Sequence, residues 1–245
     1  MATSLIAFEQ VVAGYTSSMM ILNDLTLDAR EREITLLIGP NGAGKSTVLK
    51  TLFGILTPRS GEIRFEGKVI SRKSPRDLLG QGIAFVPQGR NLFPSLTVLH
   101  NLELGGITLP TTVLNERIDE VLQRFPRLKE RIDNQASTLS GGEQKQLEIS
   151  RALLLRPRVL LIDEPSIGLS PKISQEVLRL LRGLVDAGTT VLMVEQNVRS
   201  ALTVADRALV LEMGRLALDR PASELLDDPD LNRLFLGGHA TPTKH

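Results

Sequence analysis

One glycine-rich segment constrains the fold of this chain more than any other feature. Residues 39–47 read Gly39-Pro40-Asn41-Gly42-Ala43-Gly44-Lys45-Ser46-Thr47, and they directly follow the continuously apolar run Ile34–Ile38. Such a run is typical of a strand buried on both faces of a parallel sheet. The segment matches the P-loop (Walker A) pattern, in which backbone N–H groups and a helix N-terminus surround phosphate. We therefore predict an α/β fold with a nucleotide-binding loop between a buried strand and a helix.

The residues of this loop have distinct predicted contacts. All of Gly39 to Thr47 are candidates for holding the phosphates of ATP. Lys45 is expected to reach the β- and γ-phosphate oxygens, and the Ser46 hydroxyl is expected to ligate Mg²⁺. The alternative is a chance glycine-rich turn, which ordinary amino-acid usage produces in about one in a hundred chains of this length.

A pair of carboxylates follows a second apolar run, Val159–Ile162. Asp163 and Glu164 then stand at the carboxyl end of a strand, where α/β sheets bind their ligands. We expect Asp163 to hold Mg²⁺, directly or through water. Glu164 is expected to point the other way, because side chains alternate along a strand, and to polarise a water at the γ-phosphate. A solvated strand end is the alternative for an isolated Asp-Glu pair.

Composition limits the remaining possibilities. The chain has 245 residues, no cysteine, a net charge of +1 and only the histidines His100, His239 and His245. Any metal should therefore have oxygen ligands. The near-neutral charge gives little reason to expect nucleic acid as a partner. Apolar runs are far shorter than the roughly 20 residues of a membrane span, and residues 1–10 lack an export signal, so we expect a cytoplasmic protein.

The pattern of apolar residues predicts a single domain over residues 1–236 and a loose tail at 237–245. Residues 1–87 and 157–236 should form the α/β core, with an N-terminal antiparallel β region, and residues 88–156 an inserted helical subdomain. The expected strands are 5–12, 22–27, 34–38, 62–65, 159–162 and 190–194. The expected helices begin after Lys45 and cover 97–104, 113–125, 141–155 and the apolar stripe of 173–184.

A second glycine motif reads Leu139-Ser140-Gly141-Gly142-Glu143-Gln144 and opens one of these helices. Ser140 and Glu143 have the spacing of a capping box, which is sufficient to start a helix. Capping does not explain two glycines, which weaken the first turn but leave its N–H groups open to an anion. We interpret the motif as a second phosphate-facing surface.

Together these motifs resemble those of ATP-binding cassette (ABC) proteins, from Tyr15 to about Met213. Two ABC subunits pack head to tail, so the resemblance implies that ATP lies between the P-loop of one copy and Ser140, Gly141 and Gly142 of the other. The second ATP-binding subunit would be an identical or a different chain. Such a pair has two equivalent sites.

Two further residues gain a role only through this resemblance. Tyr15, the only tyrosine, occupies the place of an aromatic residue that stacks on adenine, although it could instead pack in the core. Gln88 matches the glutamine between the core and the helical subdomain, which would contact Mg²⁺ or the attacking water.

The sequence also departs from the family pattern at two positions. Ser170 replaces a frequent aspartate, so the interface hydrogen bonds there should differ. Gln196 stands where the family usually has a histidine; a glutamine can hydrogen-bond the γ-phosphate but cannot become cationic near neutral pH. We therefore expect hydrolysis that depends on Glu164, with Gln196 orienting groups rather than carrying a proton.

Within the family the chain looks most like the importers of branched-chain amino acids. The segments that carry this likeness are 86–98, 165–171 and 194–197. The likeness implies transmembrane permease subunits, which we expect to dock on residues 88–135, and indirectly a solute-binding protein. The ATPase would then lie on the cytoplasmic face of the cell membrane. Alternatives are an importer of urea or amides, a non-transport ABC ATPase, a P-loop phosphotransferase and an ATP switch that does not hydrolyse.

Overall fold

A six-stranded sheet forms the centre of the fold. The computed structural model describes residues 4–16, 18–89 and 91–226, so the predicted tail lies outside the described residues. The strand order is β10-β9-β3-β8-β7-β6, and all neighbours are parallel except β10, which forms an antiparallel hairpin with β9. The strands are β3 (Ile34–Ile38), β6 (Ile83–Val86), β7 (Val159–Asp163), β8 (Thr190–Val194), β9 (Arg207–Glu212) and β10 (Arg215–Pro221). The predicted buried parallel strands are confirmed, and β7 is one residue longer than predicted.

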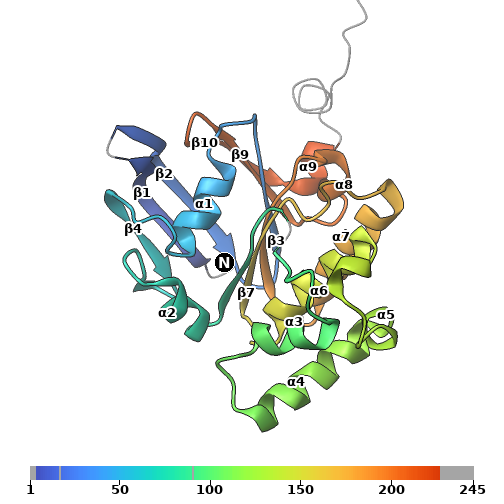
Figure 1. The fold of residues 1–245 in the computed structure, drawn as a ribbon. Helices are drawn as coiled ribbons and strands as arrows, with labels where there is room; N and C mark the ends of the chain where they lie inside the picture. Colours follow the sequence, from blue (N-terminus) through green and yellow to red (C-terminus); the bar gives the residue numbers. More distant parts are fainter. Residues whose placement is uncertain (1–3, 17, 90, 227–245) are drawn as a thin grey trace, which may run out of the picture.

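A second sheet of four antiparallel strands lies beside the first, which confirms the predicted N-terminal β region (Figure 1). Its order is β2-β1-β4-β5, with β1 (Ser4–Thr16), β2 (Met19–Arg30), β4 (Ser60–Phe65) and β5 (Lys68–Val69). Both β1 and β2 are longer than the predicted strands 5–12 and 22–27. Their pairing continues through several shifts of register, and bulges of this kind interrupt the apolar-polar alternation on which the prediction depended.

The helices of the described residues are α1 (Lys45–Leu52), α2 (Pro75–Gly80), α3 (Val98–Gly105), α4 (Thr111–Arg124), α5 (Pro126–Glu130), α6 (Gly141–Leu153), α7 (Pro171–Asp186), α8 (Val198–Leu202) and α9 (Ala222–Leu226), with a 3₁₀ turn at Ala136–Thr138. Helices α3 to α9 lie on the side of the central sheet that faces away from the four-stranded sheet (Figure 1). Helix α1 contacts strands of both sheets and lies between them in Figure 1. The predicted helices 97–104, 113–125 and 141–155 are present with ends within two residues of those observed.

The central strands separate two apolar layers. Leu36 and Ile38 of β3 belong to a cluster formed with the helices that follow β6, β7 and β8. Leu37 belongs to the other cluster, which joins the two sheets and α1. Every residue of β3 is fully buried, so the strand and the loop that follows it are held from both sides.

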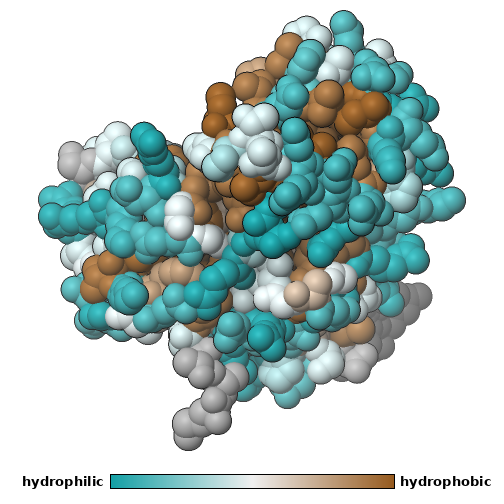
Figure 2. All heavy atoms as spheres, turned by 90° about the horizontal axis from the view of Figure 1, so that it is seen from below, coloured by the Kyte–Doolittle hydropathy of each residue, from teal (hydrophilic) through white to brown (hydrophobic). Residues whose placement is uncertain are grey.

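No helix within the described ranges is both long enough and apolar enough to cross a lipid bilayer. Figure 2 views the molecule from below the orientation of Figure 1, from the side on which α4 lies. Hydrophilic residues predominate on that face, and the apolar ones form small groups between them.

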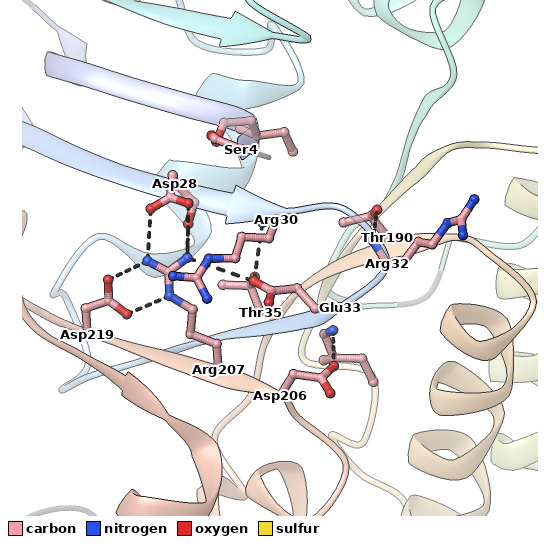
Figure 3. A network of polar contacts seen from close by, with 12 residues as sticks. Ser4, Asp28, Arg30, Arg32, Glu33, Thr35, Thr190, Asp206, Arg207 and Asp219 are labelled. Atoms are coloured by element: carbon pink, nitrogen blue, oxygen red, sulfur yellow. Dashed lines mark hydrogen bonds and ion pairs between the residues drawn. The ribbon is translucent and has the colours of Figure 1, made fainter. Parts of the chain in front are cut away.

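An ionic cluster joins the two sheets at the side away from the phosphate loop. Arg207 of β9 donates from Nη2 to Asp28 Oδ1 of β2 at 2.9 Å and from Nε to Asp219 Oδ1 of β10 at 2.6 Å (Figure 3). Its side chain is almost completely buried, while those of Asp28 and Asp219 are about one-third exposed. The hydrogen bond to Arg207 holds the pKa of Asp219 below its ordinary value.

We expect Arg207→Met to lower the free energy of unfolding by about 1–3 kcal/mol, less than for a fully buried pair because both carboxylates reach solvent. The pKa of Asp219 is lower in the folded protein than in the unfolded chain. Its contribution to stability is therefore complete above the pKa that Asp219 has in the unfolded chain, and it is lost as pH falls through the lower pKa of the folded protein. The difference between variant and wild type should therefore shrink below about pH 4. Urea denaturation at several pH values measures it.

Arg64→Ala is the matched control, since Arg64 forms exposed ion pairs with Glu9 and Glu62 in the N-terminal sheet. Its effect should stay below about 1 kcal/mol. An Arg207→Met effect no larger than that of the control would contradict a role for the cluster in joining the sheets.

Candidate functional site

The phosphate loop joins β3 to α1 and depends on glycine at two positions. Gly44 has φ of +103°, and a Cβ there would lie 2.9 Å from a side-chain carbon of Leu22. At Gly39 a Cβ would lie 2.2 Å from the backbone oxygen of Leu211. Helix α1 begins at this loop without a side-chain cap and without an acidic residue in its first turn. Its first N–H groups are therefore suited to an anion.

Lys45 lies inside the curve of the loop. Its ammonium group donates to the backbone oxygens of Gly39 and Pro40 at 2.8 and 3.0 Å, and the residue is 7% exposed. Burial lowers the pKa of Lys45, and the charges of Glu164 and Asp163 oppose that shift. The lysine is thus bound to the loop carbonyls and close enough to the two predicted carboxylates to feel their charge.

Asp163 and Ser46 lie together beside the loop. Ser46 Oγ donates to Asp163 Oδ1 at 3.1 Å. Burial raises the pKa of Asp163, and the hydrogen bond from Ser46 opposes the shift. Among the described residues no group of three or more His, Asp or Glu side chains is arranged so that it could hold a metal ion. These two oxygen donors nevertheless fit Mg²⁺, which takes few protein ligands and completes its shell with phosphate and water.

Both carboxylate oxygens of Glu164 are held by side-chain amides. Gln196, which follows β8, donates to Oε1 at 2.8 Å, and Gln88, which follows β6, donates to Oε2 at 2.6 Å. Glu164 is 5% exposed. Gln88 lies 76 positions and Gln196 lies 32 positions from Glu164 in the sequence, and the tertiary structure brings the three side chains together.

Asp163 and Glu164 contact different partners, as predicted. The predicted reason, the alternation of side chains along a strand, is wrong. The strand ends at Asp163, and Glu164 adopts a φ of +48° in the left-handed region. A left-handed residue other than glycine costs about 1–3 kcal/mol and needs support from its surroundings. The support here includes the hydrogen bond from the N–H of Glu164 to the carbonyl of Val194, at 2.9 Å. The direction of the Glu164 carboxylate is therefore set by a turn of the backbone.

Tyr15 lies at the open side of the site and does not pack in the core, because it is 50% exposed. Its hydroxyl accepts a hydrogen bond from Lys50 Nζ at 3.2 Å. A pocket of about 280 Å³ lies above the phosphate loop. It is lined by Tyr15, Ile21, Asn41, Gly42, Gly44, Lys45, Ser46, Thr47 and Glu164.

The second glycine motif does not line this pocket. Ser140 caps α6 in a capping box with Glu143, as its spacing predicts. A Cβ on Gly142 would lie 2.6 Å from Ile173 Cγ2, so close packing on α7 explains this glycine. At Gly141 a Cβ would meet only Leu169, at 3.3 Å. A single chain therefore does not bring Ser140, Gly141 and Gly142 to the phosphate loop.

Sequence reasoning missed Glu195. It is 2% exposed, directly precedes Gln196, and accepts hydrogen bonds from backbone N–H groups of two separate loops. The sequence offered one sign of a functional role for Glu195, its position immediately after an apolar strand. Acids at solvated strand ends show the same pattern, so this sign is weak.

Comparisons with known proteins place this geometry in context. The family model described as ABC transporter matches residues 22–167. The high-affinity branched-chain amino acid transport ATP-binding protein BraG of Pseudomonas aeruginosa is 43% identical, over 96% of this chain and all of that protein. The probable branched-chain amino acid transport ATP-binding protein LivF of Archaeoglobus fulgidus is 40% identical, over 92% of this chain and 95% of that protein.

Similarity extends to more distant proteins. The lipopolysaccharide export system ATP-binding protein LptB of Haemophilus influenzae is 31% identical, over 96% of this chain and 98% of that protein. Among solved structures, an ATP-binding cassette of an ABC transporter in its ADP conformation has a TM-score of 0.86 at 27% identity, covering 96% of this chain and 99% of that one.

Proposed function

Because this chain belongs to the ABC transporter family, we propose that it hydrolyses Mg-ATP between two ATP-binding subunits and so drives import of branched-chain amino acids. The observation that carries the catalytic part is the position of Glu164, a carboxylate held by two amide donors beside the phosphate loop. The identity to BraG and LivF supports the choice of substrate.

The loop residues Gly39 to Thr47 hold the phosphates, and Tyr15 stacks on the adenine from the open side of the pocket. Ser46 and Asp163 would hold Mg²⁺, and the amide oxygen of Gln88 would be a further ligand. The ion, when bound, neutralises charge on the β- and γ-phosphate oxygens. Lys45 adds a positive charge whose position is set by the loop carbonyls that it contacts.

Glu164 orients and polarises the attacking water, as a general base or through a hydrogen bond. Gln196 keeps the Glu164 carboxylate in place and reaches toward the γ-phosphate. Its amide stays neutral at all ordinary pH values, so it moves no proton. Gln88 holds the other oxygen of Glu164 and links it to the segment that leads into the helical region.

The site is completed by a second ATP-binding subunit. Because Ser140, Gly141 and Gly142 lie away from the pocket of their own chain, they are available to the nucleotide of another copy packed head to tail. At Gly141 a Cβ would meet only the end of the Leu169 side chain, at 3.3 Å, so packing requires glycine less strictly there than at Gly142, which fits an N–H group used at an interface.

A groove next to the helical region is suited to a transmembrane permease subunit. It has a volume of about 320 Å³ and is lined mostly by apolar residues, including Phe85, Leu104 and Leu155. Arg151 lies at this groove, and its buried Nε has no hydrogen-bond partner among the described residues. The protein would then sit on the cytoplasmic face of the membrane, with a solute-binding protein acting indirectly.

Replacing the proposed base separates hydrolysis from binding. We expect Glu164→Gln to reduce the ATP turnover rate by about 10²–10⁴-fold, because the glutamine cannot act as a base. Affinity for Mg-ATP, measured by calorimetry, should remain within about threefold of the wild-type value. Glu212→Gln, an exposed change at the end of β9, is the control and should hydrolyse ATP normally. Wild-type turnover by Glu164→Gln would overturn the role of Glu164.

The neutral amide at position 196 makes a prediction about pH. Gln196→His should add a transition near pH 6.5 to the rate of ATP hydrolysis, because histidine titrates there and glutamine does not. The rate is measured from about pH 5.5 to about pH 8.5 for both proteins, a range that brackets this transition. A wild-type profile that already contains the same transition, lost in Gln196→Ala, would contradict an orienting role for this amide.

The substrate proposal needs the whole transporter. After co-purification with its permease subunits and reconstitution in vesicles, we expect ATP-dependent uptake of leucine, isoleucine and valine but not of urea. Uptake of urea or an amide alone would assign the alternative importer class. Purification without any membrane subunit, together with phosphorylation of a small molecule, would instead favour a phosphotransferase.

A further inference from the structure

We propose that Glu195 is a positioning residue for ATP hydrolysis, whose carboxylate ties the loop after β7 to the loop after β8 and thereby holds Gln196 against Glu164. This inference rests on the proposed function, and it adds a residue to which neither the motifs nor the comparisons give a role.

The contacts of Glu195 join two separate segments of the chain. One oxygen, Oε1, accepts the backbone N–H of Ser166 at 2.7 Å. The other, Oε2, accepts the N–H of Gln196 at 3.1 Å and that of Asn197 at 3.4 Å. With 2% of its surface exposed, this carboxylate cannot exchange these donors for water without a rearrangement of both loops.

The two loops that it joins carry the reactive geometry. Strands β7 and β8 are parallel neighbours, and their last residues Asp163 and Val194 are paired. Glu164 and Ser166 follow the first strand, and Gln196 follows the second. Because Gln196 donates to Glu164 Oε1 at 2.8 Å, the relative position of the loops decides whether Gln196 can hold the Glu164 carboxylate in the direction that the backbone turn gives it.

A buried acid in this place has a cost that a purely apolar loop would avoid. Burial raises the pKa of Glu195, and the hydrogen bonds from Ser166, Asn197 and Gln196 oppose that shift. Within the described ranges no Lys, Arg or His forms an ion pair with it, so N–H and hydroxyl donors alone balance the charge. A carboxylate has two acceptor oxygens, so Glu195 can hold N–H groups of both loops at once, whereas an amide has only one acceptor oxygen.

Glu195→Gln tests the proposal with nearly unchanged side-chain volume. The new NH₂ group replaces one acceptor and faces either Ser166 N–H or the pair of N–H groups at Gln196 and Asn197, so one loop loses its attachment. We expect the turnover rate to fall by about 10–100-fold, the scale of a small misplacement of catalytic groups. The KM for ATP should change by less than about threefold, since the phosphate loop is untouched.

A double-mutant cycle distinguishes positioning through Gln196 from a general structural effect. Gln196→Ala should lower the turnover rate in the wild-type background but have little further effect in the Glu195→Gln background. Additive effects would overturn the proposed coupling. Glu176→Gln, an exposed change on α7, is the matched control and should leave rate and KM unchanged.

The outcomes separate this inference from the function on which it rests. If the wild-type protein binds but never hydrolyses Mg-ATP, the proposed function fails. If the wild-type protein hydrolyses ATP and Glu195→Gln does so equally fast, only the role of Glu195 fails. Glu195→Asp is the second variant, and its shorter side chain should retain only some of the contacts and an intermediate rate. Loss of folding in both variants, seen by circular dichroism, would assign a structural role and overturn the proposal.

Discussion

Parallel pairing of β6, β7, β8 and β3 brings the loops after these four strands to one edge of the central sheet. Gln88 follows the first strand, Asp163 ends the second and Glu164 directly follows it, and Gln196 follows the third. The phosphate loop follows β3. Because all four strands are buried between two apolar layers, their ends cannot shift independently. The hydrogen bonds at Glu164 depend on this arrangement, since its two partners come from different strands.

Charge is balanced at this edge in two different ways. Lys45 faces the carboxylates of Asp163 and Glu164 across the phosphate loop, and their charges partly offset its burial. The hydrogen bonds to Glu164 and Glu195 come from neutral donors, which are side-chain amides for Glu164 and chiefly backbone N–H groups for Glu195. The family usually places a titratable histidine at the position of Gln196. In this chain the direct neighbours of the proposed base do not change charge near neutral pH.

The second glycine motif shows how packing and function can share a few residues. Gly142 is required by the close approach of α6 to α7, and Ser140 caps the helix. These are sufficient structural reasons for two of the three residues. The packing reason is weaker at Gly141, where a Cβ would meet only Leu169, and the proposed use of Gly141 at the nucleotide of a neighbouring subunit remains a prediction that a single chain does not test.

The sequence by itself determined the α/β fold and the phosphate loop, because a buried parallel strand followed by Gly39–Thr47 is a local pattern with a local physical reason. It predicted three strands of the central sheet, but not β6, β9 and β10, which complete that sheet. It also indicated the family, since the order of its motifs is specific. Only the tertiary structure decided how the side chains meet. The left-handed turn at Glu164, its two amide partners and the contacts of Glu195 join loops after different strands, and Arg207 joins the two sheets. Periodicity reports which face of an element is buried, but it carries no information on which distant polar groups satisfy one another there.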